Sequence, residues 1–169
     1  MASGDTLCTF FANNHEPLDT APATLDTRVG ATNEQHLVLD FDASADESAD
    51  FAGFMPRHYS GSTGVTVTII WMATSATSGD CVWDVSFKRV QAETEDLDAS
   101  TFAAANSVTD TANGTNGEVM YATVTFTDGA DMDSVPAGEF FRLRITRNVD
   151  PSDSMTGDAE LLCIEIKDT

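Results

Sequence analysis

Apolar and polar side chains alternate along most of this chain, with a period of two from residue 36 onward. The segment 65–74 has the clearest pattern, because Val67, Ile69 and Trp71 share one face and threonine dominates the other. Alternation of β-branched and aromatic residues with polar ones is typical of a β-strand with one buried face. Similar patterns predict seven further strands, at 36–42, 50–55, 81–90, 103–110, 119–127, 139–147 and 159–167.

These eight strands define the expected fold class. Polar, glycine-containing turns separate them, and no segment has the periodicity of an amphipathic helix. Many short strands joined in this way favour an all-β protein, an antiparallel jelly-roll-type β-sandwich formed by residues 36–169. An immunoglobulin-like sandwich is the main alternative, although the Cys–Trp–Cys spacing of antibody domains is absent.

The apolar face of each strand predicts the core. A shift of one residue in register would expose the whole set, so the pattern determines which side chains point inward. Arg142 and Arg144 alternate with apolar residues and are expected to point outward. The residues expected to be buried are Leu39, Phe41, Val67, Ile69, Trp71, Trp83, Val85, Phe87, Val124, Phe126, Phe141, Leu143, Ile145, Leu162, Ile164 and Ile166.

Residues 1–35 differ from the rest of the chain. An apolar stretch at 7–12 predicts one short strand, and the remainder contains two prolines and no sustained periodicity. We expect an extended N-terminal arm that cannot bury enough apolar surface to fold alone. Its apolar residues suggest that it docks on a neighbouring subunit or another partner.

The charge of the chain excludes several classes of partner. Asp and Glu number 28 against 8 Lys and Arg, which gives a formal net charge of −20. A field of that sign repels phosphate backbones and anionic membranes, so neither nucleic acid nor a membrane is an expected partner. The N-terminus lacks the basic and apolar regions of a secretory signal. Three widely separated cysteines, without a CxxC motif, predict neither a disulfide framework nor a structural zinc site.

No catalytic motif is present. The chain lacks a nucleophile elbow, a phosphate-binding glycine loop, HExxH and a dinucleotide fingerprint, so we expect neither an enzyme nor a cofactor. The acidic segment 128–133 leaves a structural calcium ion open. Trp71, Trp83 and Tyr59 are candidates for stacking on a sugar, but both tryptophans lie on apolar strand faces, which favours core packing.

Several segments resemble a group of virion-associated proteins of tailed bacteriophages. They are ATLDTRVG, HLVLDFD, DFAGFMPRHYSG, TVTIIWMATSATSGDCVWDVSFKRV, EVMYATVTFTDGADMDSVPAGEFFRLRITR and TGDAELLCIEI, which together cover most of residues 20–167. By analogy with jelly-roll capsid decoration (cement) proteins, the resemblance implies a homotrimer made in the host cytoplasm and bound to the major capsid protein on the outer surface of the head. It implies no catalytic residues.

On this hypothesis, exposed apolar residues of the arm and of a proline-limited strand edge form the capsid or subunit contacts. The expected contact residues are Phe10, Phe11, Leu18, Leu25, Arg28, Phe54, Met55 and Tyr59. The alternative is a carbohydrate- or receptor-binding β-sandwich module of a head or tail fibre. A row of solvent-facing aromatic residues on one sheet would favour that alternative.

Overall fold

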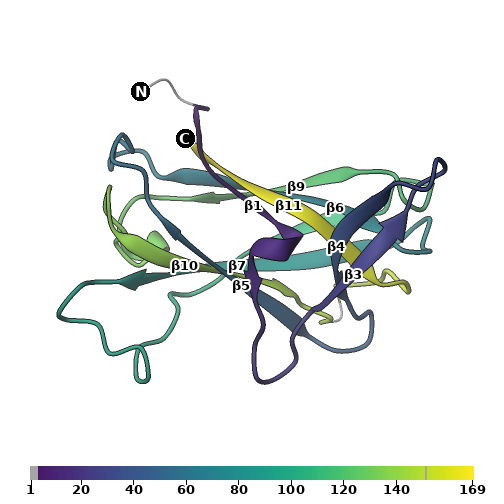
Figure 1. Ribbon diagram of the computed structural model, residues 1–169, viewed down its shortest axis with the longest axis horizontal. Coiled ribbons are helices and arrows are strands. Elements are labelled where there is room, and N and C mark those ends of the chain that lie inside the picture. Colours follow the sequence, from purple (N-terminus) through teal and green to yellow (C-terminus); the bar gives the residue numbers. More distant parts are fainter. Residues whose placement is uncertain (1–3, 151) are drawn as a thin grey trace.

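Two antiparallel β-sheets pack face to face in the computed structural model, which describes residues 4–150 and 152–169. Figure 1 shows the two layers, with β9, β6 and β11 in the upper one and β10, β7 and β5 in the lower. Apart from the strands, the described residues form only two short 3₁₀ turns, η1 (Ala12–Asn14) and η2 (Ala130–Met132). None of the described helices is long and apolar enough to cross a membrane.

The upper layer is a six-stranded sheet in which β11 is central. Its order is β3-β4-β11-β6-β9, and β1 also pairs with β11. The strands of this sheet are β1 (Thr6–Phe11), β3 (Thr24–Val29), β4 (Gln35–Phe41), β6 (Val65–Ala73), β9 (Met120–Phe126) and β11 (Ala159–Asp168).

The lower layer is a five-stranded sheet in the order β2-β5-β10-β7-β8. Most connections cross from one sheet to the other, as from β4 to β5, β5 to β6 and β6 to β7, which is the connectivity of a jelly roll. The strands of this sheet are β2 (His15–Glu16), β5 (Glu47–Phe54), β7 (Asp80–Val90), β8 (Asn106–Thr111) and β10 (Phe140–Arg147).

The predicted fold class is confirmed, and each of the eight predicted strands has a counterpart in β4 to β11. Residues 1–35 depart from the prediction of a single short strand, because β1, β2 and β3 all lie there and pair with the sandwich. Phe10 of β1 enters the core beside Phe51, with ring centroids 5.8 Å apart. Gly53 leaves space for it, since a Cβ at that position would lie 2.8 Å from the Phe10 ring.

The predicted core is confirmed except at Leu162. A β-bulge between Leu161 and Cys163 shifts the register of β11, so Leu161 is fully buried in place of Leu162. A bulge places one extra residue in its strand, which reverses the face of every later side chain relative to a simple alternation. Both Leu162 and Cys163 are consequently partly exposed on the outer side of the sheet.

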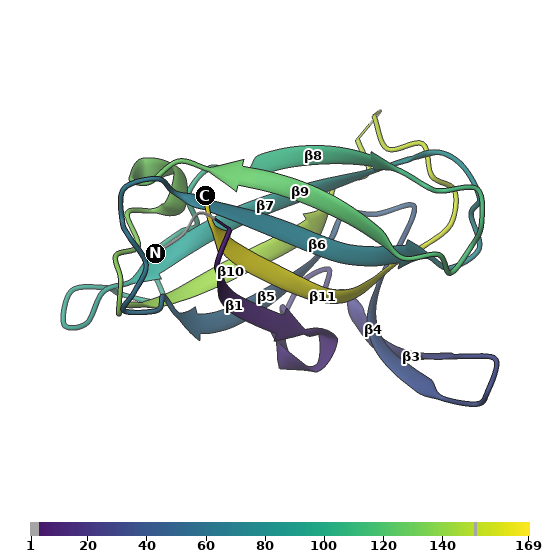
Figure 2. The ribbon, with the colours of Figure 1, turned by 90° about the horizontal axis from the view of Figure 1, so that it is seen from above.

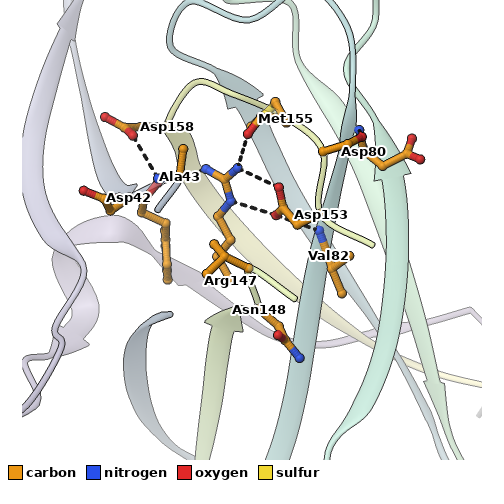
Figure 3. Close-up of polar contacts among 12 residues, drawn as sticks. Asp42, Ala43, Asp80, Val82, Arg147, Asn148, Asp153, Met155 and Asp158 are labelled. Carbon is orange, nitrogen blue, oxygen red and sulfur yellow. Dashed lines mark hydrogen bonds and ion pairs between the residues drawn. The ribbon is translucent and has the colours of Figure 1, made fainter. Parts of the chain in front are cut away.

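A fully buried arginine joins the end of β10 to the loop that precedes β11. Arg147 has 0% exposure and forms a bidentate ion pair with Asp153, at 2.9 and 3.0 Å. Its remaining donors bond the backbone carbonyl oxygens of Phe41, Met155 and Gly157. Figure 3 shows the contacts of Arg147 with Asp153 and Met155. The guanidinium is therefore satisfied by one carboxylate and three carbonyls, a set that makes burial of the charge tolerable.

Replacing Asp153 with alanine should lower the free energy of unfolding by ~3–5 kcal/mol, because Arg147 would remain buried without its counter-ion. Chemical denaturation followed by tryptophan fluorescence measures this loss. Asp98→Ala is the matched control, since Asp98 is exposed in a loop and should change stability little. Equal stability of the two variants would contradict a structural role for the buried pair.

Candidate functional site

An apolar row crosses the outer face of the six-stranded sheet. The strand registers pair Phe11 of β1 with Cys163 of β11, Cys163 with Ile70 of β6, and Ile70 with Tyr121 of β9. Figure 2 views this face from above, with β9, β6 and β11 side by side and β1 beyond β11. With strands ~4.8 Å apart, the row is roughly 14 Å long from β1 to β9.

Aromatic side chains form the two ends of this row. Phe11 is 57% exposed and Tyr121 is 67% exposed, so both rings are open to solvent. Exposed apolar patches of this kind mark interaction sites more often than scattered surface residues do. The next row on the same face is polar, with Glu165, Thr68 and Thr123 in register. The apolar row is therefore bordered by hydrogen-bonding groups.

Two adjoining cavities lie along this face, and we call them together the outer groove. The larger, of about 560 Å³, lies between η1 and β4 and is lined by Phe11, Ile70 and Cys163 among others. The smaller, of about 220 Å³, includes Met72 and Val119. His36 and Leu162 line both cavities, so the groove is continuous from η1 to the segment before β9.

The bulge in β11 creates the floor of the outer groove. It turns two consecutive side chains, Leu162 and Cys163, toward the same side, whereas a regular strand would turn one of them into the core. At the same point β11 exchanges its partner, from β4 at Leu161 to β1 at Cys163. Burial raises the pKa of the Cys163 thiol, which therefore stays neutral and contributes an apolar surface.

Polar groups at one end of the groove are held by an ion pair. Arg28 of β3 donates to Glu160 of β11 at 2.7 Å and to the backbone oxygen of Thr74 at 3.3 Å. Gly117 permits this arrangement, because a Cβ there would lie 2.7 Å from the Arg28 guanidinium. Apolar surface with a few fixed polar groups is the usual character of a ligand site.

Of the eight residues predicted to contact the capsid or another subunit, five are at least partly exposed and three are buried. Phe11, Leu25 and Phe54 are exposed, and Leu18 and Arg28 are partly exposed. The expectation for Phe10, Met55 and Tyr59 requires correction, because all three are buried in the core of the sandwich. These three residues are apolar because they pack between the sheets. Their positions in the N-terminal segment and near a proline did not indicate this packing in the sequence.

The candidates for sugar stacking are also buried. Trp71 and Trp83 have no exposure, as the preference for core packing predicts, and Tyr59 donates its hydroxyl to Asp128 at 2.9 Å inside the fold. Tyr121 of β9, which was not among these candidates, is 67% exposed on the outer face of the six-stranded sheet. Its signal is present in the sequence, since Met120 and Ala122 occupy the apolar positions of β9 and leave Tyr121 on the polar face.

The acidic loop considered for calcium has its carboxylates directed to separate partners. Asp128 accepts from Tyr59, Asp131 from the backbone of Thr127, and Asp133 from the backbone of Arg89. Across residues 4–150 and 152–169, no cluster of three or more potential metal ligands was found. The loop contributes hydrogen bonds to the fold and offers no converging set of oxygens.

No protein-family model matches the sequence, and no curated protein matches it. Solved structures share its fold. The CBM22-1–GH10 modules of Clostridium thermocellum endo-1,4-beta-D-xylanase 10B, complexed with xylohexaose, align over 97% of this chain with a TM-score of 0.51 and 11% identity. An exo-beta-agarase aligns over 98% with a TM-score of 0.52 and 11% identity. This chain spans 28% and 25% of those two chains, respectively. The likeness establishes the sandwich fold.

Asp40 of β4 lies beside Glu160, the carboxylate that pairs with Arg28, and near other acidic residues. Burial, together with the charges of Asp158 and Glu160, raises its pKa from 3.8 to about 6. Between pH 4 and 6 the folded state therefore holds a proton that the unfolded chain has already released. The native state loses stability as the pH rises through this window, and the loss is complete above pH 6.

Asp40→Asn should consequently increase stability at pH 7 to 8 and have little effect near pH 3, below both pKa values, where the wild-type carboxyl is largely protonated in both states. Thermal unfolding of both proteins across pH 3–8 tests this difference. Asp98→Asn makes the same change in net charge at an exposed position and serves as the control. A pH-independent difference between Asp40→Asn and wild type would contradict the raised pKa.

Proposed function

We propose that this protein is a carbohydrate-binding module without catalytic activity, which holds a neutral oligosaccharide on the outer face of its six-stranded sheet. The observation that carries the proposal is the row from Phe11 through Cys163 and Ile70 to Tyr121, beside the outer groove. Two solvent-facing aromatic residues on one sheet, one at each end of the row, favour a carbohydrate ligand. The row also suits a chain-like ligand better than a compact one, because the groove is long and open.

The chemistry of the row matches the faces of sugar rings. A pyranose ring has apolar C–H faces and a polar rim of hydroxyl groups. Phe11 and Tyr121 offer flat apolar surfaces, and the phenol of Tyr121 adds a hydrogen-bonding group. Thr123 and Glu165, in the neighbouring row, offer polar groups to ring hydroxyls on the same face, whereas Thr68 between them is buried. The backbone that carries these side chains is already ordered, because they belong to paired strands, so binding does not have to order a loop.

Charge near the groove favours a neutral ligand. Glu160 and Glu165 project on the same face of β11 and pair with Arg28 and Lys167, so neither of these cations is left to attract an anionic ligand. Asp40 of β4 adds a further carboxyl beside Glu160. The chain as a whole carries a formal charge of −20. An anionic polysaccharide would approach this surface against a repulsive field. Neutral backbones such as xylan, cellulose and agarose avoid that cost.

The similar structures support this proposal through their fold and through the sugar described in one of them. The xylanase modules share the jelly-roll fold and are described in complex with xylohexaose, and the second structure is an exo-beta-agarase. Jelly rolls also occur in viral capsid and lectin domains. The likeness is therefore compatible with binding, and the argument for a ligand depends on the exposed row of this chain.

Capsid decoration as a homotrimer has weaker support. Three of its eight predicted contact residues are buried, and the two similar structures above are of a xylanase and an exo-beta-agarase. Phe54 is the most exposed member of the set, at 66%, and lies against Phe140 at the edge of the other sheet. Copurification with phage heads, and light scattering for the trimer, would test that hypothesis directly.

Isothermal titration with xylohexaose, cellohexaose and neoagarohexaose tests the proposal, after affinity electrophoresis has screened soluble polysaccharides. Tyr121→Ala should weaken binding of the preferred ligand at least tenfold, or ~1.4 kcal/mol, through loss of the aromatic surface. Phe11→Ala should have a similar effect. Both side chains are largely exposed, so neither variant should unfold.

Phe54→Ala is the matched control, because Phe54 is as exposed as Tyr121 and lies on the other sheet. It should leave the affinity unchanged. Failure of every neutral polysaccharide to bind would refute the proposal, as would an equal loss of affinity in Phe54→Ala and Tyr121→Ala.

A further inference from the structure

Three of the chain's eight basic residues gather on the outer face of the five-stranded sheet. Lys88 belongs to β7, and Arg142 and Arg144 belong to β10. The chain has an excess of 20 acidic residues, so a cluster of three cations is unexpected from composition alone. The cluster lies on the opposite side of the sandwich from the outer groove.

The strand register brings two of these cations directly together. Arg142 and Lys88 are cross-strand partners on β10 and β7, and Arg144 lies on the same face two residues along. Like charges directly opposite one another destabilise a sheet. A pairing of this kind requires a compensating anion, from the protein or from a ligand.

The protein supplies only part of that compensation. Asp50 of β5 accepts two hydrogen bonds from Arg144, at 2.7 and 3.0 Å, and one from Arg142 at 3.3 Å. Glu16 pairs with Arg142 at 2.5 Å. Three cations therefore face two carboxylates, which leaves one positive charge.

Lys88 is the cation without a carboxylate. Its side chain is buried, and its Nζ donates to the backbone oxygens of Ser100 at 2.9 Å and Leu97 at 3.5 Å. Within the described residues, no carboxylate pairs with this Nζ. The Nε of Arg142 is likewise buried, and it has no hydrogen-bond partner among the described residues. Buried donors without partners are rare in folded proteins and indicate a missing ligand or solvent molecule.

A cavity of about 320 Å³ lies where these groups meet. It is lined by the three cations and Asp50 and by Ser100, Thr101 and Phe102 of the loop after β7. Arg144 stacks over the Phe102 ring at 4.3 Å, and Ala103 bonds Phe87 of β7, so the loop is attached to the sheet. The volume is at the lower end of the range for small-molecule sites.

We infer that this cavity binds a carboxylate-bearing monosaccharide unit, such as a uronic acid. The carboxylate lies against Lys88 and Arg142 and neutralises the one uncompensated charge, and a singly charged group matches it better than a phosphate dianion. Ser100 and Thr101 provide hydroxyl groups for the sugar rim. The inference does not depend on the proposed function, because the two sites are on opposite faces and involve different residues.

The test is binding of sodium D-glucuronate and D-galacturonate to the full chain, with D-glucose and D-galactose as neutral comparators. Isothermal titration at low ionic strength should detect the uronates alone, with affinity falling as salt increases. Lys88→Met keeps the aliphatic stem and removes the charge, and should weaken binding at least tenfold. Lys167→Met, at the chain's other lysine, makes the same charge change on the opposite sheet and should bind as wild type does.

A second measurement uses the wild-type protein alone, so its result does not depend on whether Lys88→Met folds. In wild-type protein, the ¹⁵N–¹H resonance of the Arg142 Nε should shift on addition of glucuronate, whereas that of Arg57 should not. The inference is overturned if neither uronate binds, if Lys88→Met folds and binds normally, or if phosphate or sulfate binds more tightly than the uronates. Tyr121→Ala should leave uronate binding intact, which separates failure of this site from failure of the outer groove.

Discussion

Strand β11 pairs with β6 along one edge and with two different strands along the other, and a single bulge makes that exchange possible. Before the bulge, Leu161 is opposite Leu39 of β4; after it, Cys163 is opposite Phe11 of β1. The extra residue restores the inward direction of Ile164 and Ile166, so both halves of β11 contribute to the same core. The same extra residue places Leu162 and Cys163 outward together. The closure of the core and the floor of the outer groove thus depend on one local irregularity.

The alternation of apolar and polar residues predicts most of this architecture, because a half-buried strand repeats its environment every second residue. It fails where that repeat is interrupted. The run Leu161-Leu162-Cys163 is apolar throughout and gives no indication of which residue is extra. Strand β3 carries no continuous apolar face, since it is exposed along most of its length, and its pairing with β4 depends on backbone hydrogen bonds. Patterns of side chains contain little information about such a strand.

Two residues that the sequence analysis missed, one in the core and one in the candidate site, follow from a strict application of the same alternation. Arg147 has the parity of Phe141, Leu143 and Ile145, so the alternation predicts an inward arginine, which its charge makes easy to dismiss. Tyr121 has the parity of the polar positions in β9, so the alternation predicts an outward aromatic residue. Residues whose chemistry disagrees with their position in the pattern are candidates for special roles. The cavity around Lys88 could not be predicted in this way, because its prediction requires knowing that β10 pairs with β5 and β7.

Because acidic residues greatly outnumber basic ones, most basic side chains have a carboxylate partner, and one without such a partner indicates a candidate anion site. Arg28, Arg89, Arg147 and Lys167 each pair with a carboxylate, and Arg142 and Arg144 share Asp50. In such a surplus of acids, Lys88 is exceptional, because its ammonium group is held only by carbonyl oxygens.

Alternate side chains on a strand face opposite sides of the sheet. The single strand β10 therefore holds Arg147 in the core and Arg142 and Arg144 on the surface. The inward side chains of both sheets maintain the fold, whereas the outward side chains of the two sheets can differ. The outer face of the six-stranded sheet carries an apolar row bordered by acidic residues, and that of the five-stranded sheet carries the cluster of three cations. The two faces therefore suit ligands of different charge, and substitutions on one face have no direct contact through which to affect the other.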